Sequence, residues 1–293
     1  MKRKVAAGVF ILFFMFCIIC GLLMTCYLGT HLSKSANRDI GSPPKNMSAE
    51  SIVIHNTLGK TVHGWFFPGE KYAPVIALFH RVRSDRREMT GRARFLVQDG
   101  FNVLTIDLQA HGESRGDHIT YGLLESFDVK ASAAYLRKRF PDRMIGAVGV
   151  SLGGASCLLG ETPADFDALV IEAVFPNIND AVKNRIGMRL GRAGRLLSFL
   201  LVYQLQLRLG VSPQELRPED SIKNFHNPLL VIAGSHDRHT PLHESKRLFD
   251  NADEPKELWV IEGAGHENFH AFSPKEYEKK ILNFFSEHLT SNN

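Results

Sequence analysis

Short apolar runs alternate with longer stretches of helical hydrophobic spacing along most of the chain. Such alternation predicts a mostly parallel sheet covered by helices on both faces. The apolar runs expected to form buried strands are residues 75–79, 103–106, 145–150, 169–174, 229–233 and 258–261. The stretches expected to form helices between and after them are residues 92–99, 124–139, 242–252 and 274–289. Two earlier strands, 52–56 and 61–67, are predicted to form a hairpin around Gly59, which makes the sheet mixed and eight-stranded.

Residues 176–220 interrupt this alternation, because they contain no strand signal. An apolar run at 196–207 lies inside the segment, and basic residues surround it: Lys183, Arg185, Arg189, Arg192, Arg195 and Arg208. We predict a helical cap inserted over the sheet. Its arginines have two interpretations: the solvated side of helices packed on the core, or a basic surface lying against an anionic membrane.

The N-terminus begins with Lys2-Arg3-Lys4 and continues as an almost unbroken apolar run over residues 5–28. That run is long enough to cross a hydrocarbon core of ~30 Å as a helix. We therefore expect a membrane anchor at 1–30, a linker at 31–49 and one α/β domain at 50–290. A cleaved signal peptide is the alternative. The positive-inside rule places the N-terminus in the cytoplasm and the domain on the periplasmic or other extracytoplasmic side of a single-pass protein.

The charge of the chain is unevenly divided. The formal net charge is +4, and the first 45 residues, with six Lys/Arg and one Asp, account for +5 of it. Residues 46–293 therefore carry a net charge of −1, which gives no globally basic domain for binding nucleic acid.

The segment Gly149-Val150-Ser151-Leu152-Gly153 has the G-x-S-x-G pattern of a nucleophile elbow. It follows a predicted strand and precedes small residues that can open a helix. Gly149 and Gly153 lack the Cβ atoms that would clash in so sharp a turn, so the hydroxyl of Ser151 can stand exposed at the edge of the sheet. Ser151 is the candidate nucleophile.

Two further candidates follow later strands. Asp237 comes after the run at 229–233, and His266 comes after the run at 258–261. Ser, Asp and His in this chain order match the α/β-hydrolase triad. Because open α/β sheets place their chemistry beyond the carboxyl ends of the strands, we expect these three side chains at one edge of the sheet. His266 would be the base, and Asp237 would hold its tautomer.

The chain resembles the α/β-hydrolase superfamily, and within it the lipase-, lysophospholipase- and serine-aminopeptidase-like branch. Beyond the elbow and triad, the resemblance rests on Leu78-Phe79-His80, Asp107-Leu108-Gln109-Ala110-His111-Gly112-Glu113-Ser114 and Gly234-Ser235-His236-Asp237-Arg238-His239-Thr240-Pro241. It implies an oxyanion hole formed by the N–H groups of Leu152 and Val82. Arg81 stands where the family usually has glycine, and it is strained if that position needs a positive φ.

The resemblance implies no metal or other cofactor, and we do not interpret His236, His239 and His243 as a zinc site. His111 is expected to shape its turn. The predicted function is that of a membrane-anchored serine hydrolase of carboxylic esters, acting on a small-molecule acyl ester or lipid. A serine aminopeptidase or amidase is the enzymatic alternative, although a substrate amine would call for an acidic cap. The second alternative is a catalytically inactive binding module.

Overall fold

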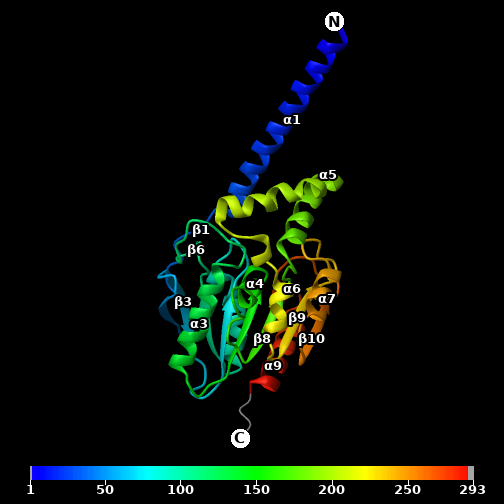
Figure 1. Cartoon of the computed structure of the whole chain (residues 1–293). Coiled ribbons are helices and arrows are strands. Elements are labelled where there is room, and N and C mark those ends of the chain that lie inside the picture. Colours follow the sequence, from blue (N-terminus) through cyan, green and yellow to red (C-terminus); the bar gives the residue numbers. More distant parts are fainter. Residues whose placement is uncertain (1, 290–293) are drawn as a thin grey trace.

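The structure is a computed structural model that describes residues 2–289 of the chain. Its centre is an eight-stranded sheet with the order β10-β9-β8-β7-β4-β5-β3-β2 (Figure 1). The strands are β2 (Glu50–His55), β3 (Thr61–Phe67), β4 (Val75–Phe79), β5 (Asn102–Ile106), β7 (Ile145–Val150), β8 (Ala168–Glu172), β9 (Leu229–Gly234) and β10 (Lys256–Ile261).

Only the strands at one side of this sheet run antiparallel. β3 is antiparallel to both β2 and β5, whereas the pairs from β5 through β4 to β10 are parallel. The β2–β3 hairpin turns at Gly59, which has a φ of 72°. The predicted mixed, mostly parallel eight-stranded α/β-hydrolase sheet is confirmed.

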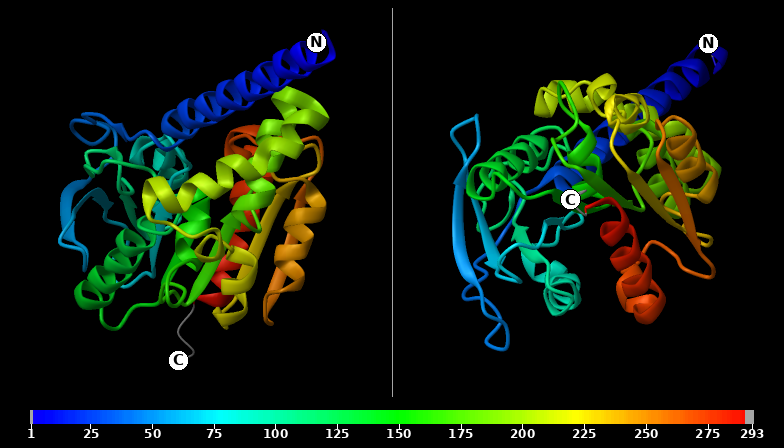
Figure 2. Two further views of the ribbon diagram at one scale, coloured as in Figure 1. Left: turned by 45° about the horizontal axis from the view of Figure 1, so that its top comes forward. Right: turned by 90° about the horizontal axis from the view of Figure 1, so that it is seen from below.

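The sheet separates two hydrophobic cores, because successive side chains of a strand point to opposite faces. In β4, Val75, Ala77 and Phe79 belong to one core, while Ile76 and Leu78 belong to the other. The helices α3 (Glu125–Arg139), α4 (Leu152–Leu158) and α7 (Leu242–Asp250) contribute to the first core. The second is covered by α2 (Thr90–Gln98) and α9 (Pro274–His288), so helices lie on both faces (Figure 2).

The N-terminal helix α1 (Lys2–Ser33) projects away from this domain (Figure 1). Within the described residues it is the one helix long and apolar enough to cross a membrane, over Gly8–Ser33. The chain after it lies against the domain, since β1 (Ala36–Asn37) pairs with β6 (His111–Gly112) in parallel. The helix thus continues beyond residue 30, and the first residues of the expected linker are ordered on the domain.

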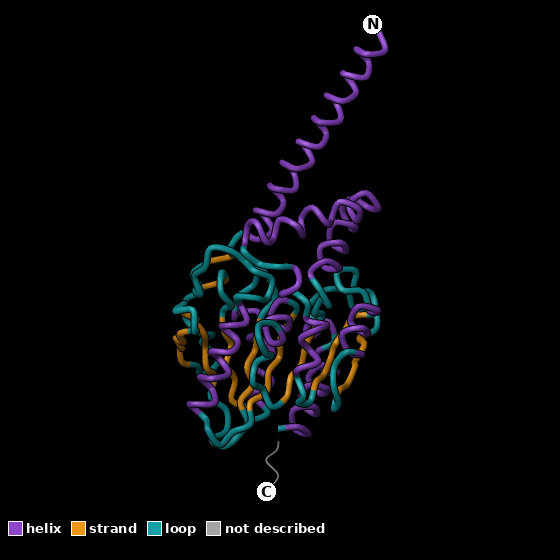
Figure 3. Tube along the Cα trace, in the orientation of Figure 1, coloured by secondary structure: helices purple, strands orange, loops and turns teal. Residues whose placement is uncertain are grey.

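The segment at 176–220 forms helices above the sheet, and its described residues contain no strand. Its main element is α5 (Ile178–Leu209), which bends at Gly191, where φ is 60° and ψ is −143°. The first arm rises from the domain and the second lies across it near the base of α1 (Figure 3). Short turns lead back to β9 through η2 (Pro213–Glu215), α6 (Pro218–Ser221) and η3 (Ile222–Asn224).

Candidate active site

Ser151 lies in the turn between β7 and α4, with a φ of 50° and a ψ of −105°. This conformation is unfavourable for a residue with a side chain, so the turn is strained and is held by the surrounding structure. A Cβ atom on Gly149 would lie 2.5 Å from the Cα atom of Gly154, and one on Gly153 would meet the carbonyl of Phe79. Both glycines are therefore required by the close approach of β4, β7 and α4.

Asp237 and His266 are in direct contact at the same edge of the sheet. The Nδ1 atom of His266 lies 2.7 Å from Oδ2 of Asp237. The other carboxylate oxygen accepts hydrogen bonds from the backbone N–H groups of His239, at 2.7 Å, and Thr240, at 2.9 Å. The carboxylate of Asp237 is buried, so these bonds fix it and orient the imidazole. A proton on Nδ1 leaves Nε2 of His266 free to act as a base.

The structure brings Ser151 to the same edge without a direct hydrogen bond to His266 among the described residues. Ser151 follows β7, and His266 follows β10. The ring of His239 packs against that of His266, with centroids 4.8 Å apart, and His239 lines the same cavity as Ser151. In hydrolases without a bound substrate, catalytic hydrogen bonds are often long and tighten only in the complex.

The predicted oxyanion-hole residues Leu152 and Val82 line this cavity together with Ser151. Leu152 is the first residue of α4, whose N–H group has no partner within the helix. Within the described residues, the N–H group of Val82 also donates no hydrogen bond. Two unpaired backbone donors thus lie beside the candidate nucleophile.

The strain expected at Arg81 is found two residues later. Arg83 has a φ of 61°, whereas the φ of Arg81 is not positive. The guanidinium of Arg81 forms an ion pair with Glu88, and its N–H group donates to the same carboxylate. Arg83 instead donates to the carbonyl groups of His31 and Leu32 at the end of α1. The positive φ in this loop therefore belongs to Arg83, directly after Val82, and not to Arg81.

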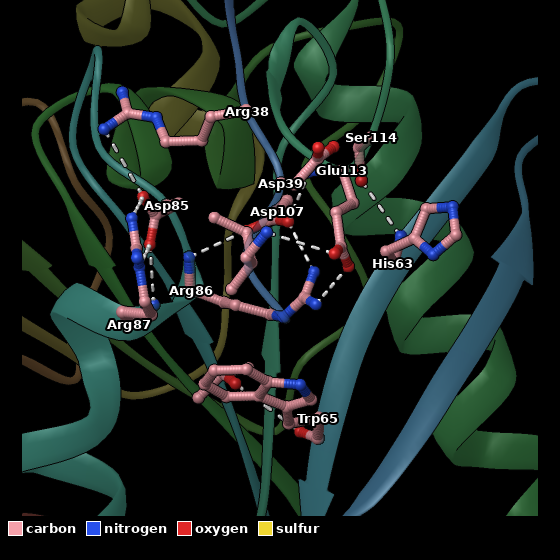
Figure 4. A network of polar contacts seen from close by, with 12 residues as sticks. Arg38, Asp39, His63, Trp65, Asp85, Arg86, Arg87, Asp107, Glu113 and Ser114 are labelled. Carbon is pink, nitrogen blue, oxygen red and sulfur yellow. Dashed lines mark hydrogen bonds and ion pairs between the residues drawn. The ribbon is translucent and has the colours of Figure 1, made fainter. Parts of the chain in front are cut away.

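The turn at 107–114 holds this loop in place (Figure 4). The carboxylate of Asp107 accepts hydrogen bonds from the N–H groups of Arg86 and Glu113, both at 2.8 Å, and pairs with the guanidinium of Arg86. Ser114 accepts from the N–H group of His63 at 2.9 Å. His111 is buried, and burial together with the neighbouring His80 lowers its pKa to about 3. The Nδ1 atom of His111 lies 2.9 Å from the carbonyl oxygen of Gln109 in the same turn, a contact that fits a turn-shaping role.

A cavity of about 650 Å³ opens over Ser151, within the range of ~300–1,000 Å³ typical of ligand sites. Its walls are mostly apolar and come from the sheet edge, the cap and, unexpectedly, α1. The sequence analysis did not identify Tyr121 or the α1 residues as part of the site, and it placed His239 in the acid loop without assigning it to the cavity. Tyr121 has a φ of 57°, and burial raises its pKa to about 12. In the sequence, the glycine at 122 directly after Tyr121 was the signal that could have indicated a turn with positive φ here.

His239 packs on the ring of His266, beside Asp237. Burial, together with the adjacent His266, lowers the pKa of His239 to about 4. Among the described residues, no three His, Cys, Asp or Glu side chains gather in a way that could hold a metal ion.

Comparison with known proteins agrees with this geometry. Residues 61–280 match the model of the alpha/beta hydrolase family, and the chain belongs to that family. The resemblance drawn from the sequence is thereby confirmed at the level of the superfamily.

Particular relatives extend the comparison. The chain is 25% identical to the uncharacterised protein YqkD of Bacillus subtilis, over 84% of this chain and 82% of that one. It is 29% identical to human protein ABHD12B over 59% of this chain and 47% of the relative. Among solved structures, the esterase Pf2001 of Pyrococcus furiosus superposes with a TM-score of 0.71 at 20% identity, covering 88% of this chain and all of the other. The last match concerns the fold alone.

Proposed function

We propose that this protein is a membrane-anchored serine hydrolase that cleaves carboxylic esters through an acyl-enzyme on Ser151, with acyl lipids as the favoured substrates. One observation carries the proposal. A serine in a strained elbow faces an apolar cavity, beside two unpaired N–H groups and at the same sheet edge as a histidine bonded to a buried aspartate. That combination matches the requirements of nucleophilic acyl transfer.

In the first half of the proposed reaction, Oγ of Ser151 attacks the acyl carbonyl carbon while Nε2 of His266 takes the hydroxyl proton. The carbonyl π electrons move to oxygen, and the N–H groups of Leu152 and Val82 stabilise that oxyanion. The tetrahedral intermediate then collapses, and the C–O bond to the alcohol breaks. His266 returns the proton to the leaving alcohol, while Asp237 stabilises the imidazolium throughout.

The second half regenerates the serine. Water attacks the acyl carbon of the ester on Ser151 and gives a proton to His266. A second tetrahedral intermediate forms, and its bond to Oγ breaks. The carboxylic acid leaves, and His266 returns the proton to Ser151. No group outside the chain is needed for either half except water.

The cavity also bears on the choice between ester and amine substrates. Arg83, Arg185, Arg189 and Arg208 line it, and its lining contains no Asp or Glu. A free substrate amine therefore has no carboxylate partner in the cavity, which disfavours the aminopeptidase alternative. An acyl chain, in contrast, finds apolar walls along most of the surface.

The direct test is hydrolysis of p-nitrophenyl esters by the full chain in detergent. We expect Ser151→Ala to lower kcat/KM by at least about 10³-fold, because the nucleophile is lost while binding remains. Ser132→Ala is the matched control, since its buried hydroxyl bonds only to the carbonyl of Asp128 in α3. Full activity of Ser151→Ala would contradict the proposal, and Ser151-independent amide cleavage would point to another centre.

We further propose that residues 1–30 anchor the protein, with the N-terminus in the cytoplasm and the hydrolase domain, residues 50–290, outside it. The apolar helix over Gly8–Ser33 supports a membrane span, and Lys2-Arg3-Lys4 supports this orientation. Within that division, residues 176–220 act as the cap over the site.

A further inference from the structure

One face of α1 is turned toward the hydrolase domain at the end of the helix. Thr25 and Ser33 are buried, and Leu28, Gly29 and Leu32 line the cavity over Ser151. These positions recur every three to four residues, so they share one side of the helix. Residues on the other side are open, and Tyr27 is 71% exposed.

Hydrogen bonds fasten this end of α1 to the cap. The guanidinium of Arg208 in α5 donates to the carbonyl of Cys26 at 2.6 Å, and the amide of Gln204 donates to the hydroxyl of Thr25 at 3.0 Å. A Cβ atom at Gly29 would lie close to the guanidinium of Arg208. Glycine thus allows α5 to pass closely over α1 at the cavity.

The same end is fastened to the domain itself. The guanidinium of Arg83 donates to the carbonyl of Leu32 at 3.2 Å, and the N–H group of Ile119 donates to the carbonyl of Ser33 at 2.8 Å. Arg83 adjoins Val82, one of the two proposed oxyanion donors. The end of α1 is therefore held against both the cap and the loop beside the reacting carbonyl.

We propose that Leu28, Gly29 and Leu32 form a wall of the acyl-binding site, so that the helix that anchors the enzyme also sets the chain length of the substrate it accepts. This inference rests on the proposed esterase function and names its substrate class: a single-chain, long-acyl ester. The apolar side chains of α1 border the same cavity as Ser151, and residues of α5 line that cavity as well.

The position of α1 favours a substrate that already resides in a lipid leaflet. Residues 28–33 are the last turns of the apolar helix and form the C-terminal end of the candidate membrane span Gly8–Ser33. A chain bound along Leu28 and Leu32 therefore lies beside the point at which α1 leaves the membrane. The volume of about 650 Å³ accommodates one long acyl chain more readily than the two chains of a diacyl lipid.

The test measures chain-length profiles of the full-length protein in detergent, with p-nitrophenyl acetate, butyrate, laurate and palmitate. Leu32→Trp and Gly29→Leu narrow the proposed wall, and Leu32→Ala widens it. Leu23→Trp is the matched control, because Leu23 lies on the same helix, is 65% exposed and does not line the cavity. Hydrolysis of acetate reports whether the catalytic centre remains folded.

We expect Leu32→Trp and Gly29→Leu to lower the ratio of kcat/KM for laurate and palmitate to kcat/KM for acetate about tenfold or more. Leu32→Ala should move the preference toward palmitate, and Leu23→Trp should match the wild type. If the bulky variants also lose acetate hydrolysis, the chain-length profile of Leu32→Ala tests the wall instead. A shift toward palmitate supports the wall, and an unchanged profile contradicts it.

An unchanged chain-length profile in the Leu32 and Gly29 variants, with hydrolysis still dependent on Ser151, overturns the wall and leaves the proposed function standing. Absence of any Ser151-dependent hydrolysis in the wild type overturns the proposed function, and this inference falls with it.

Discussion

At the scale of single residues, the neighbours of each candidate site residue restrict its backbone conformation and the orientation of its side chain. Ser151 has a positive φ, and a glycine lies two residues away on each side. The pattern of glycines makes this turn predictable from sequence. The bond between His266 and Asp237 is predictable as well, because both residues follow neighbouring parallel strands. The packing of His239 on His266 is not, since it depends on how two loops fold over each other.

The first residue-scale prediction concerns Gly153. An added Cβ atom would press on the backbone carbonyl of Phe79, which cannot move without distorting β4. We expect Gly153→Ala to lower the free energy of unfolding by about 1–3 kcal/mol and to reduce ester hydrolysis. Thermal unfolding and initial rates measure both effects.

Gly265→Ala is the matched control for this substitution. Its Cβ atom would have its nearest neighbour 3.7 Å away, an ordinary contact, and its backbone does not need a positive φ. Wild-type stability and activity in Gly153→Ala would show that the elbow tolerates a side chain, contrary to the geometry described above.

At the scale of elements, burial decides how well the sequence predicts structure. β4 and β7 match their predicted bounds because both are continuous apolar runs buried on two faces. The helical character of 176–220 also follows from the sequence. The bend at Gly191 could not be predicted, because many glycines in helical sequences remain helical and only the tertiary position of the second arm requires it here.

The segment after α1 gives a second prediction. The carboxylate of Glu113 accepts hydrogen bonds from the N–H groups of Ile40, at 3.1 Å, and Gly41, at 3.2 Å, and pairs with Arg86. Although burial opposes the charge, Arg86 and these N–H groups lower the pKa of Glu113 from 4.5 to about 2. Because the pKa is lower in the folded state, this contribution to stability is present above about pH 4.5 and is lost as the pH falls toward about 2.

We therefore expect Glu113→Gln to raise the hydrogen-exchange rate of residues 36–41 about tenfold at neutral pH, since hydrogen bonds to a charged acceptor are lost. In the wild type, the protection of this segment should decline as the pH is lowered from about 4.5 toward about 2. Asp39→Asn is the control within the same segment, because Asp39 is exposed and pairs only with the exposed Arg115. Equal exchange in both variants would argue against Glu113 as the fastening residue.

At the scale of the whole molecule, α1, the cap and the sheet edge enclose one cavity. The second arm of α5 buries Leu201 and Leu205, yet Phe199, Tyr203 and Leu207 are exposed on its opposite side. These three positions are four residues apart and form one stripe. An apolar stripe beside exposed arginines on a helix that contacts α1 favours the membrane-surface interpretation of the basic cap. The sequence could not reveal that α1 reaches the cavity, because its apolar run fits any membrane helix.

The whole-molecule prediction is that α1 is retained in the mature protein. Its removal would open the cavity wall and leave the buried faces of α5 without their partner. We expect the intact mass of the purified protein to include residues 1–33, and the domain to be protected from protease in sealed vesicles with the cytoplasmic face outward. A mature chain that begins after residue 33 would contradict the anchor. Digestion of the domain in such vesicles would show the opposite orientation, with the domain on the cytoplasmic side.

The central claim is that Ser151 carries the acyl group, and the most direct measurement is the mass of a trapped acyl-enzyme. The full chain would be mixed with p-nitrophenyl laurate, quenched in acid within the first turnover and digested for mass spectrometry. The account predicts a laurate adduct on the peptide containing Ser151, with no adduct in Ser151→Ala. An adduct on another residue, or hydrolysis with no adduct and no loss of rate in Ser151→Ala, would contradict it.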